Sequence, residues 1–222
     1  HRPPRARADH VAAHRGRARG LHRLPDRGAR ALGGHLAGET GNPLGAKHPI
    51  VSGRVVLFGQ TMRVQVIVPP AIEKGVSVSI RKYVSRVLNV REVGFLDGRQ
   101  VDVDGLRLDR LKTLTDMAQA GDLENLFRAA IRDKMNILVS GGTSSGKTTL
   151  ARALLAISDR DERMVTIEDA PELHLPHPNT VALVAERRVG SERSPALLLE
   201  SALRMRPDRL ILGEIRGVEA LN

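Results

Sequence analysis

The sequence predicts an α/β fold with a mainly parallel sheet, preceded by a smaller α+β domain. Strand and helix patterns alternate between residues 135 and 214, an order that produces parallel strands joined by helical crossovers. Before them, residues 50–81 contain short β-branched runs, which are typical of paired strands. The hydrophobic fraction is 41% but only 2% of residues are aromatic, so both cores must be built from aliphatic side chains.

The composition excludes several classes of protein. There is no cysteine, which rules out disulfides and thiolate metal sites. No stretch approaches the roughly 18–20 uninterrupted apolar residues that a membrane-spanning helix needs, and we see no export signal. We therefore expect a soluble protein, and the lack of cysteine suits a reducing compartment.

Most of the net charge of +10 lies at the N-terminus. Residues 1–30 hold nine arginines against two aspartates, a balance of +7, and they lack aromatics that could stack on bases. A basic tail and a nucleic-acid binding arm both fit this pattern. Residues 1–45 show neither a helical nor a strand period, so we expect a basic, disordered segment there.

The first half of the chain contains three strand patterns. Residues 55–58 and 63–68 are β-branched, and residues 76–81 alternate strictly between apolar and polar positions. We assign a partial N-terminal domain to residues 46–105. Residues 106–121 follow as a linker with a helix near 108–117.

The second half starts with an amphipathic helix behind Asp122, whose apolar residues recur at helical spacing. Ser194-Pro195 marks the start of a later helix, because serine caps and proline suits the first turn. The expected elements are, in order, a helix at 123–131, a strand at 136–140, a helix at 147–157, a strand at 164–167, a helix at 196–205 and a strand at 210–212.

The segment GGTSSGKT follows the strand expected at 136–140 and has the Walker A spacing. Its glycines allow backbone N–H groups to approach phosphate oxygens, and the following helix presents its positive end to an anion. Lys147 would neutralise the β- and γ-phosphates, and the Thr148 hydroxyl would bind Mg²⁺. The predicted nucleotide-binding residues are Gly141, Gly142, Thr143, Ser144, Ser145, Gly146, Lys147, Thr148 and Thr149.

Two predicted strands end in acids, which a P-loop needs near its metal and its attacking water. Glu214 follows the apolar run 210–212 and could act as general base. Glu168 and Asp169 follow the strand at 164–167, at the edge where an open parallel sheet gathers its ligands. Acids at strand ends are also common as solvated residues or helix caps. We predict that Thr148, Glu168 and Glu214 form the metal site.

Three separated motifs resemble those of the hexameric secretion ATPases, in particular the traffic ATPases of type IV (conjugative) secretion systems. GGTSSGKTTLARALL resembles their Walker A, TIEDAPELHLPHPN their Asp box, and LLLESALRMRPDRLILGEIRG their Walker B region. The last motif is far more specific than a P-loop alone. The resemblance runs from about Asn42 to the end of the chain.

This resemblance implies a RecA-like P-loop ATPase core at 122–222, with ATP and Mg²⁺ bound between the core and the smaller N-terminal domain. It implies a homo-oligomer, a hexameric ring at the cytoplasmic face of the inner membrane, with inner-membrane components of the secretion machine as partners. ATP hydrolysis would power substrate export or pilus assembly, in conjugal transfer or in a related type II system. The family's downstream histidine motif lies beyond Asn222, so we expect a C-terminally incomplete core.

The resemblance also implies roles for individual residues. Lys147 and Thr148 would hold phosphate and metal, Glu168 is the Asp-box acid and Glu214 the Walker B glutamate. Arginines of the N-terminal domain reach the terminal phosphate in this family, and the matching positions are Arg63 in MRVQVIVPP and Arg81 in SVSIRK. Guanidinium groups suit this task, because they bind phosphate oxygens in a fork.

Two other functions are compatible with the sequence. The net positive charge suits a nucleic-acid-binding P-loop translocase, whose affinity would fall steeply with added salt. A non-hydrolysing nucleotide-binding fragment would bind ATP without turnover.

Overall fold

The computed structural model describes residues 10–15, 18–23, 26–82 and 103–216. The chain forms two compact units, one from His1–Tyr83 with Asp159–Asn222 and the other from Val84–Ser158. The predicted disordered segment, N-terminal domain and Walker B region each extend partly outside the described residues, at 1–9, 16–17, 24–25, 83–102 and 217–222. None of the described helices is both long and apolar enough to cross a membrane.

Regular structure begins earlier than we predicted for residues 1–45. Two antiparallel strands, β1 (His10–Arg15) and β2 (Ala18–Arg23), pair with each other, and the helix α1 (Asp26–Glu39) follows. The expectation of disorder is therefore wrong for these described parts of the segment. The composition suggested disorder because glycine and arginine are frequent in this segment, and because the residues that α1 buries are mostly small.

The buried face of α1 consists of Ala29, Gly33, Leu36 and Ala37, at helical spacing. A Cβ atom at Gly33 would lie only 3.0 Å from Val76 Cγ1 and 3.1 Å from Val66 Cγ1. The absent side chain thus allows the helix to approach the neighbouring sheet closely. Gly33 therefore permits this packing, in a segment where the sequence showed no helical period.

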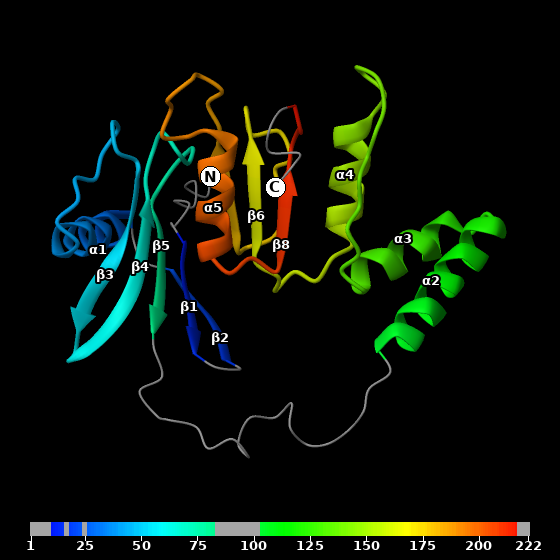
Figure 1. Ribbon diagram of the computed structural model, residues 1–222, viewed down its shortest axis with the longest axis horizontal. Coiled ribbons are helices and arrows are strands. Elements are labelled where there is room, and N and C mark those ends of the chain that lie inside the picture. Colours follow the sequence, from blue (N-terminus) through cyan, green and yellow to red (C-terminus); the bar gives the residue numbers. More distant parts are fainter. Residues whose placement is uncertain (1–9, 16–17, 24–25, 83–102, 217–222) are drawn as a thin grey trace, which may run out of the picture. The chain divides into compact units, whose positions relative to one another are not determined.

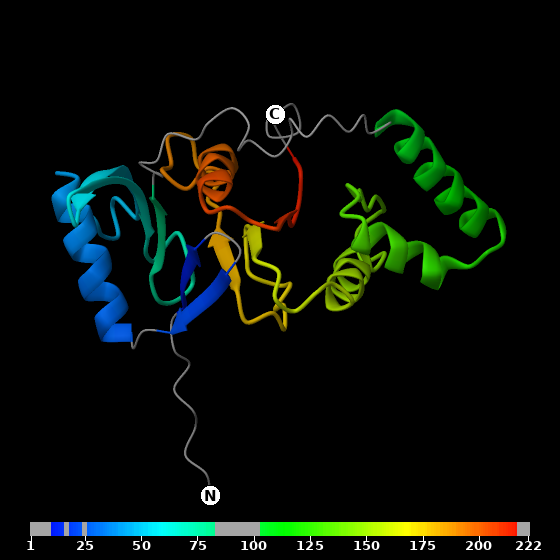
Figure 2. The same ribbon diagram turned by 90° about the horizontal axis from the view of Figure 1, so that it is seen from below.

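That sheet contains β3 (Ile50–Leu57), β4 (Gln60–Ile67) and β5 (Ser77–Lys82), paired antiparallel in this order. The three strands predicted in this half are confirmed. One face buries valines and Met62 against α1, as the alternating pattern requires. Figures 1 and 2 show α1 lying along this face of the sheet.

A parallel sheet of order β7-β6-β8 forms the second half of the same unit. Its strands are β6 (Met164–Glu168), β7 (Thr180–Val184) and β8 (Arg209–Leu212), and α5 (Pro195–Arg204) connects β7 to β8 (Figure 1). The predicted α/β class with parallel pairing is confirmed. β7 was not predicted, because it is short and follows a proline- and histidine-rich segment.

The aliphatic core of the parallel sheet includes residues from the segment that follows β4. Ile67, Ala71 and Ile72 pack with β6, β7 and α5, and Val184 donates a backbone hydrogen bond to Ala71 O at 2.9 Å. The sheet is thus covered by residues distant in sequence.

The other compact unit contains α2 (Val103–Gln119), α3 (Leu123–Arg132) and α4 (Lys147–Ala156). Asp122 caps α3 as predicted, accepting a hydrogen bond from Asn125 N. The helix expected near 108–117 is present but longer, and it includes most of the segment that we assigned to a linker.

The strand predicted at 136–140 is absent: residues 135–140 have no regular structure, and no described strand pairs with them. Ile137 is 40% exposed and Leu138 80% exposed. An apolar β-branched run reports a local preference, but a strand forms only when a partner completes its hydrogen-bond ladder.

Polar side chains tie the starts of β6 and β8 together. The buried Arg163 donates from Nε to Met205 O and from a terminal nitrogen to Asn179 Oδ1, at 2.9 and 2.7 Å. Its backbone N–H donates to Asp208 Oδ2 at 2.8 Å. Burial lowers the pKa of Arg163, and the nearby Asp208 opposes that shift. The RPDR part of the sequence therefore has a structural role in joining these strands.

Arg209 forms a forked ion pair with Glu162, with side chains only 11% and 8% exposed. Arg209→Met would remove the guanidinium group that pairs with the buried Glu162 carboxylate, so we expect a loss of about 3 kcal/mol in the free energy of unfolding, measured by urea denaturation. As a control, Glu200→Gln removes the exposed pair with Arg204 and should cost about 0.5 kcal/mol or less. Equal losses in both variants would contradict this account.

Candidate nucleotide-binding site

The Walker A segment curls between residues 135–140 and α4. Gly146 is the residue before the helix, with φ +86°, and no side chain caps the helix start. The first backbone bond of the helix runs from Leu150 N to Gly146 O at 2.9 Å. The N–H groups of Lys147, Thr148 and Thr149 therefore have no intrahelical acceptor, and they form the positive end that an anion can bind.

Lys147 closes the loop that precedes its own helix. Its ammonium group donates to Gly141 O at 2.9 Å and to Gly142 O at 2.6 Å. A Cβ atom at Gly141 would lie 2.6 Å from Ser145 Oγ, so a larger residue there would require the Ser145 hydroxyl to rotate away. The side chain predicted to bind phosphate is thus held at the loop by carbonyl groups.

The structure brings together all of the predicted nucleotide-binding residues in one exposed turn and the first turn of α4. Ser144 has a positive φ of 61°, and Lys147 is half-buried while its neighbours are exposed. The exposed members are Gly141, Gly142, Thr143, Ser144, Ser145, Gly146, Thr148 and Thr149.

Glu168 ends β6 and is buried, with both carboxylate oxygens engaged. Oε1 accepts from the Thr166 hydroxyl at 2.7 Å, and Oε2 accepts from Glu172 N at 2.8 Å and Leu173 N at 3.1 Å. This carboxylate holds the Asp-box segment against its own strand. Its predicted role toward a metal stays a prediction, and its hydrogen bonds define a positioning role.

Gly213, in the predicted Walker B segment, packs against Glu168. A Cβ atom at Gly213 would lie 3.0 Å from Glu168 Cγ and 3.4 Å from Ile167 O, while Gly213 N donates to Ile167 O at 2.8 Å. Because the Glu168 side chain is fixed by three hydrogen bonds, it cannot easily move aside. The buried Glu168 side chain therefore explains why the residue before Glu214 is a glycine.

Glu214 lies in a cluster of alternating charges at the ends of the parallel strands. Its carboxylate pairs with Arg216, while Arg187 donates to Asp169 Oδ2 at 2.7 Å and to the Glu214 carbonyl at 3.3 Å. The hydrogen bond and charge of Glu214 raise the pKa of Arg216. The Glu214 side chain is 48% exposed. Unlike Glu168, it lies open to solvent.

Sequence reasoning missed both arginines as partners of these acids. Arg216 belongs to the GE-x-R pattern, which could have indicated it. Nothing local marks Arg187, which reaches Asp169 across 18 positions of the chain.

Arg63 and Arg81 lie directly opposite each other on β4 and β5, and both are exposed. Side chains at opposite positions of antiparallel strands project from the same face, about 5 Å apart at Cβ. Their predicted phosphate contact stays a prediction, but the register gives them a common side of the sheet.

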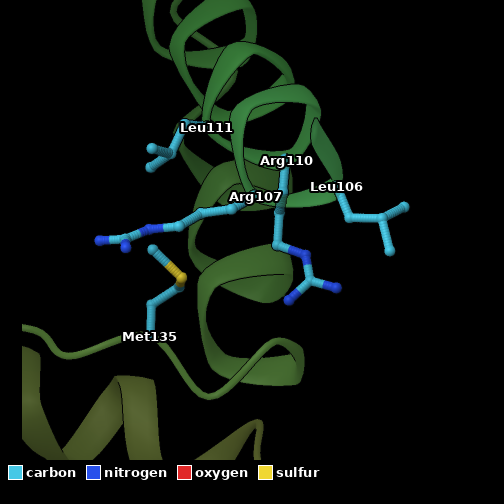
Figure 3. Close-up of a pocket in the computed structure, with 5 residues that line it drawn as sticks. All are labelled: Leu106, Arg107, Arg110, Leu111 and Met135. Atoms are coloured by element: carbon cyan, nitrogen blue, oxygen red, sulfur yellow. The ribbon is translucent and has the colours of Figure 1, made fainter. Parts of the chain in front are cut away.

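A pocket of about 360 Å³ lies in the helical unit, and its lining contains no Walker A residue. Figure 3 shows Arg107 and Arg110 from α2 beside Met135, with Leu106 and Leu111 completing the lining. In the described residues, no three His, Cys, Asp or Glu side chains gather as a metal site would need.

An exposed Walker A turn at the start of a helix is the feature that defines a P-loop nucleotide-binding protein. The chain belongs to the family of type II/IV secretion system proteins, whose model matches residues 56–222. The predicted resemblance is thereby confirmed at the level of the family.

Individual relatives support this assignment. The chain is 40% identical to the type IV secretion system protein VirB11 of Bartonella quintana over 186 residues, or 77% of this chain and 51% of the relative. It is 40% identical to VirB11 of Brucella suis over 167 residues, or 71% of this chain and 46% of the relative. The chain thus spans about half the length of the curated relatives it matches.

The fold also resembles a solved structure. The crystal structure of the VirB11 ATPase from the Brucella suis type IV secretion system, in complex with sulphate, matches with a TM-score of 0.78 and 32% identity. The match covers 94% of this chain and 64% of that chain. The expected fold class is confirmed by this similarity.

Glu168→Ala should destabilise the unit that contains it, because two backbone N–H groups lose a charged acceptor. We expect a loss of about 2 kcal/mol in urea unfolding, with faster hydrogen exchange at the amides of Glu172 and Leu173. Asp169→Ala serves as the control, since its pair with Arg187 is partly exposed and should contribute about 0.5 kcal/mol. Unchanged exchange at both amides would refute the positioning role.

Proposed function

We propose that the chain is part of an ATP-hydrolysing motor subunit of a type IV secretion or conjugal transfer system. The observation that carries the proposal is the Walker A turn, in which the exposed start of α4 offers three backbone N–H groups beside Lys147. The VirB11 relatives support the secretion role, since their names assign them to such systems.

Phosphate binding would use the loop much as it stands. A polyphosphate carries several negative charges, so it competes well for the Lys147 ammonium against the two neutral carbonyls that hold it. The helix start and the glycine-bounded turn add neutral donors. ATP rather than another nucleotide follows from the family alone, because none of these groups reads a base.

The residues fit a Mg²⁺ ion of the P-loop kind, which is held by one or two protein oxygens together with phosphates and water. Thr148 would supply its exposed hydroxyl. Glu168 fits direct coordination less well, because three hydrogen bonds already occupy its oxygens. When bound, Mg²⁺ neutralises charge on the phosphates during their transfer.

Glu214 would orient the attacking water and accept its proton, as an exposed carboxylate at the end of β8. Release of Arg216 frees the oxygen that this task requires. Arg63 and Arg81 would hold charge that develops on the terminal phosphate. The output of the cycle is motion between domains that drives export or pilus assembly.

The remaining parts of the proposal concern assembly and location. We propose a homo-oligomer, a hexameric ring by family resemblance, at the cytoplasmic face of the inner membrane. Its partners would be the inner-membrane components of the secretion machine.

Lys147→Ala tests the phosphate site. We expect the affinity for MgATP to fall about 10- to 100-fold in isothermal titration calorimetry, since a charge-assisted contact is lost. The matched control is Lys112→Ala, an exposed lysine on α2, which should bind as the parent chain does. Wild-type affinity in Lys147→Ala would overturn the site.

Glu214→Gln tests the catalytic base. The variant should bind MgATP normally, but its rate of phosphate release should fall by about 100-fold or more, because glutamine cannot accept the proton. Phosphate release is measured in a coupled assay on this chain and on a C-terminally extended one. Normal hydrolysis would remove the assignment of Glu214, and binding without turnover in both parent chains would instead favour a nucleotide-binding module.

A further inference from the structure

One arginine side chain connects the ends of all three strands of the parallel sheet. Arg187 follows β7, and its Nε donates to Oδ2 of Asp169, directly after β6, at 2.7 Å. A terminal nitrogen of the same guanidinium donates to the carbonyl oxygen of Glu214, beyond the end of β8, at 3.3 Å. Because β6 lies between β7 and β8, the side chain reaches from one outer strand across the central strand to the other. All three residues belong to one compact unit.

The backbone at Glu214 has few other restraints. The last backbone hydrogen bond between β8 and β6 runs from Gly213 N to Ile167 O at 2.8 Å, so the pairing stops one residue before Glu214. The Glu214 carboxylate pairs with Arg216, but these side chains are 48% and 59% exposed, and an exposed pair holds its members only loosely. Within the described part of the chain, the hydrogen bond from Arg187 is therefore the contact that fixes the carbonyl group of Glu214.

Fixing this carbonyl group restricts where the Glu214 side chain can lie. The peptide unit that follows Glu214 is planar, so a restraint on its oxygen limits rotation of the backbone at that residue. A general base must lie within hydrogen-bond reach of the water that it activates, and a misplacement of about 1 Å can lower a rate about 100-fold. A restraint on the backbone at Glu214 would therefore influence the rate of hydrolysis.

We propose that Arg187 is a positioning residue for ATP hydrolysis, which acts through Glu214. This inference rests on the proposed function, in which Glu214 orients the attacking water and accepts its proton. Arginine suits the role, because its planar group donates to a carboxylate and to a carbonyl in fixed directions at the same time. Asp169 holds the guanidinium in place, through an ion pair in which the arginine is 30% exposed and the aspartate 42%.

The neighbouring Arg188 has different surroundings. Its side chain is 77% exposed and approaches the Glu186 carboxylate at 3.7 Å. Two adjacent arginines thus carry the same charge, but one bonds to the segments after β6 and β8 and the other lies in solvent. If positive charge alone mattered, both would have the same effect on hydrolysis, whereas positioning requires an effect of Arg187 only.

The first test compares Arg187→Ala with the parent sequence in steady-state ATP hydrolysis, on this chain and on a C-terminally extended one. We expect kcat to fall about 10- to 100-fold while KM changes less than twofold, because no Walker A group is altered. Arg187→Lys should recover part of the rate, since lysine keeps the charge but loses the fork. The matched control, Arg188→Ala, should leave both constants unchanged. An unchanged kcat in Arg187→Ala would overturn the inference.

A double variant shows whether Arg187 acts through Glu214. If it does, adding Arg187→Ala to Glu214→Gln should lower kcat less than twofold further, because the group that Arg187 positions has already lost its function. A merely structural role would lower kcat by the same factor with either residue at position 214. That result would overturn the inference.

Binding and unfolding measurements separate positioning from folding. Arg187→Ala should bind a non-hydrolysable ATP analogue with Mg²⁺ within twofold of the parent chain in calorimetry. Its Tm should fall by only a few degrees, since the ion pair that it loses is partly exposed. Loss of analogue binding together with loss of kcat would assign Arg187 a structural role and overturn the inference.

The outcome for Glu214→Gln separates this inference from the proposed function. Slow hydrolysis in Glu214→Gln with full activity in Arg187→Ala would overturn the inference alone. Normal hydrolysis in Glu214→Gln, or no hydrolysis in either parent chain, would overturn the proposed function and the inference with it.

Discussion

The buried carboxylate of Glu168 is the interaction on which the acidic edge of the parallel sheet depends. It ends the central strand, accepts hydrogen bonds from two backbone N–H groups of the Asp-box segment, and lies against Gly213, which directly follows the neighbouring strand β8. A buried ionised group is tolerated only when hydrogen bonds satisfy it, and here three do so. One side chain thus contacts both the segment that follows β6 and the residue that follows β8.

The residues beside it differ in character, and the difference divides their tasks. Glu168 is almost fully enclosed, whereas Asp169 and Glu214 are partly exposed and each faces an arginine. A side chain that must move a proton needs access to water, while one that shapes a loop needs rigidity. Two glutamates near adjacent strand ends therefore differ in the tasks that they suit, because their surroundings differ.

The sequence allowed the elements with clear periodicity to be predicted, and local patterns explain why. The alternation in β5, the capped start of α3 and the Ser-Pro start of α5 each involve only neighbouring residues. The predictions that were wrong concern elements that depend on distant partners. The helix α1 packs at Gly33 against valines of the antiparallel sheet. The strand expected at 136–140 would need a neighbouring strand to complete its hydrogen bonds, and no described strand pairs with it.

The same distinction applies to the candidate site. Motif spacing located the Walker A turn and the acids that end β6 and β8. Motif spacing could not reveal that the Glu168 carboxylate accepts backbone hydrogen bonds, or that Arg187 donates a hydrogen bond to Asp169. These contacts arise only when separate segments meet. Position is encoded locally, but the chemical state of a side chain depends on the fold around it.

The start of α4 departs from the usual rules of helix capping, and this departure has a cost in stability. The Walker A turn exposes backbone amides by omitting side chains, which leaves a helix start uncapped. An uncapped helix start lowers the stability of the free protein, as expected where function conflicts with folding. The local rule of helix capping is therefore broken where a bound anion would complete the helix start.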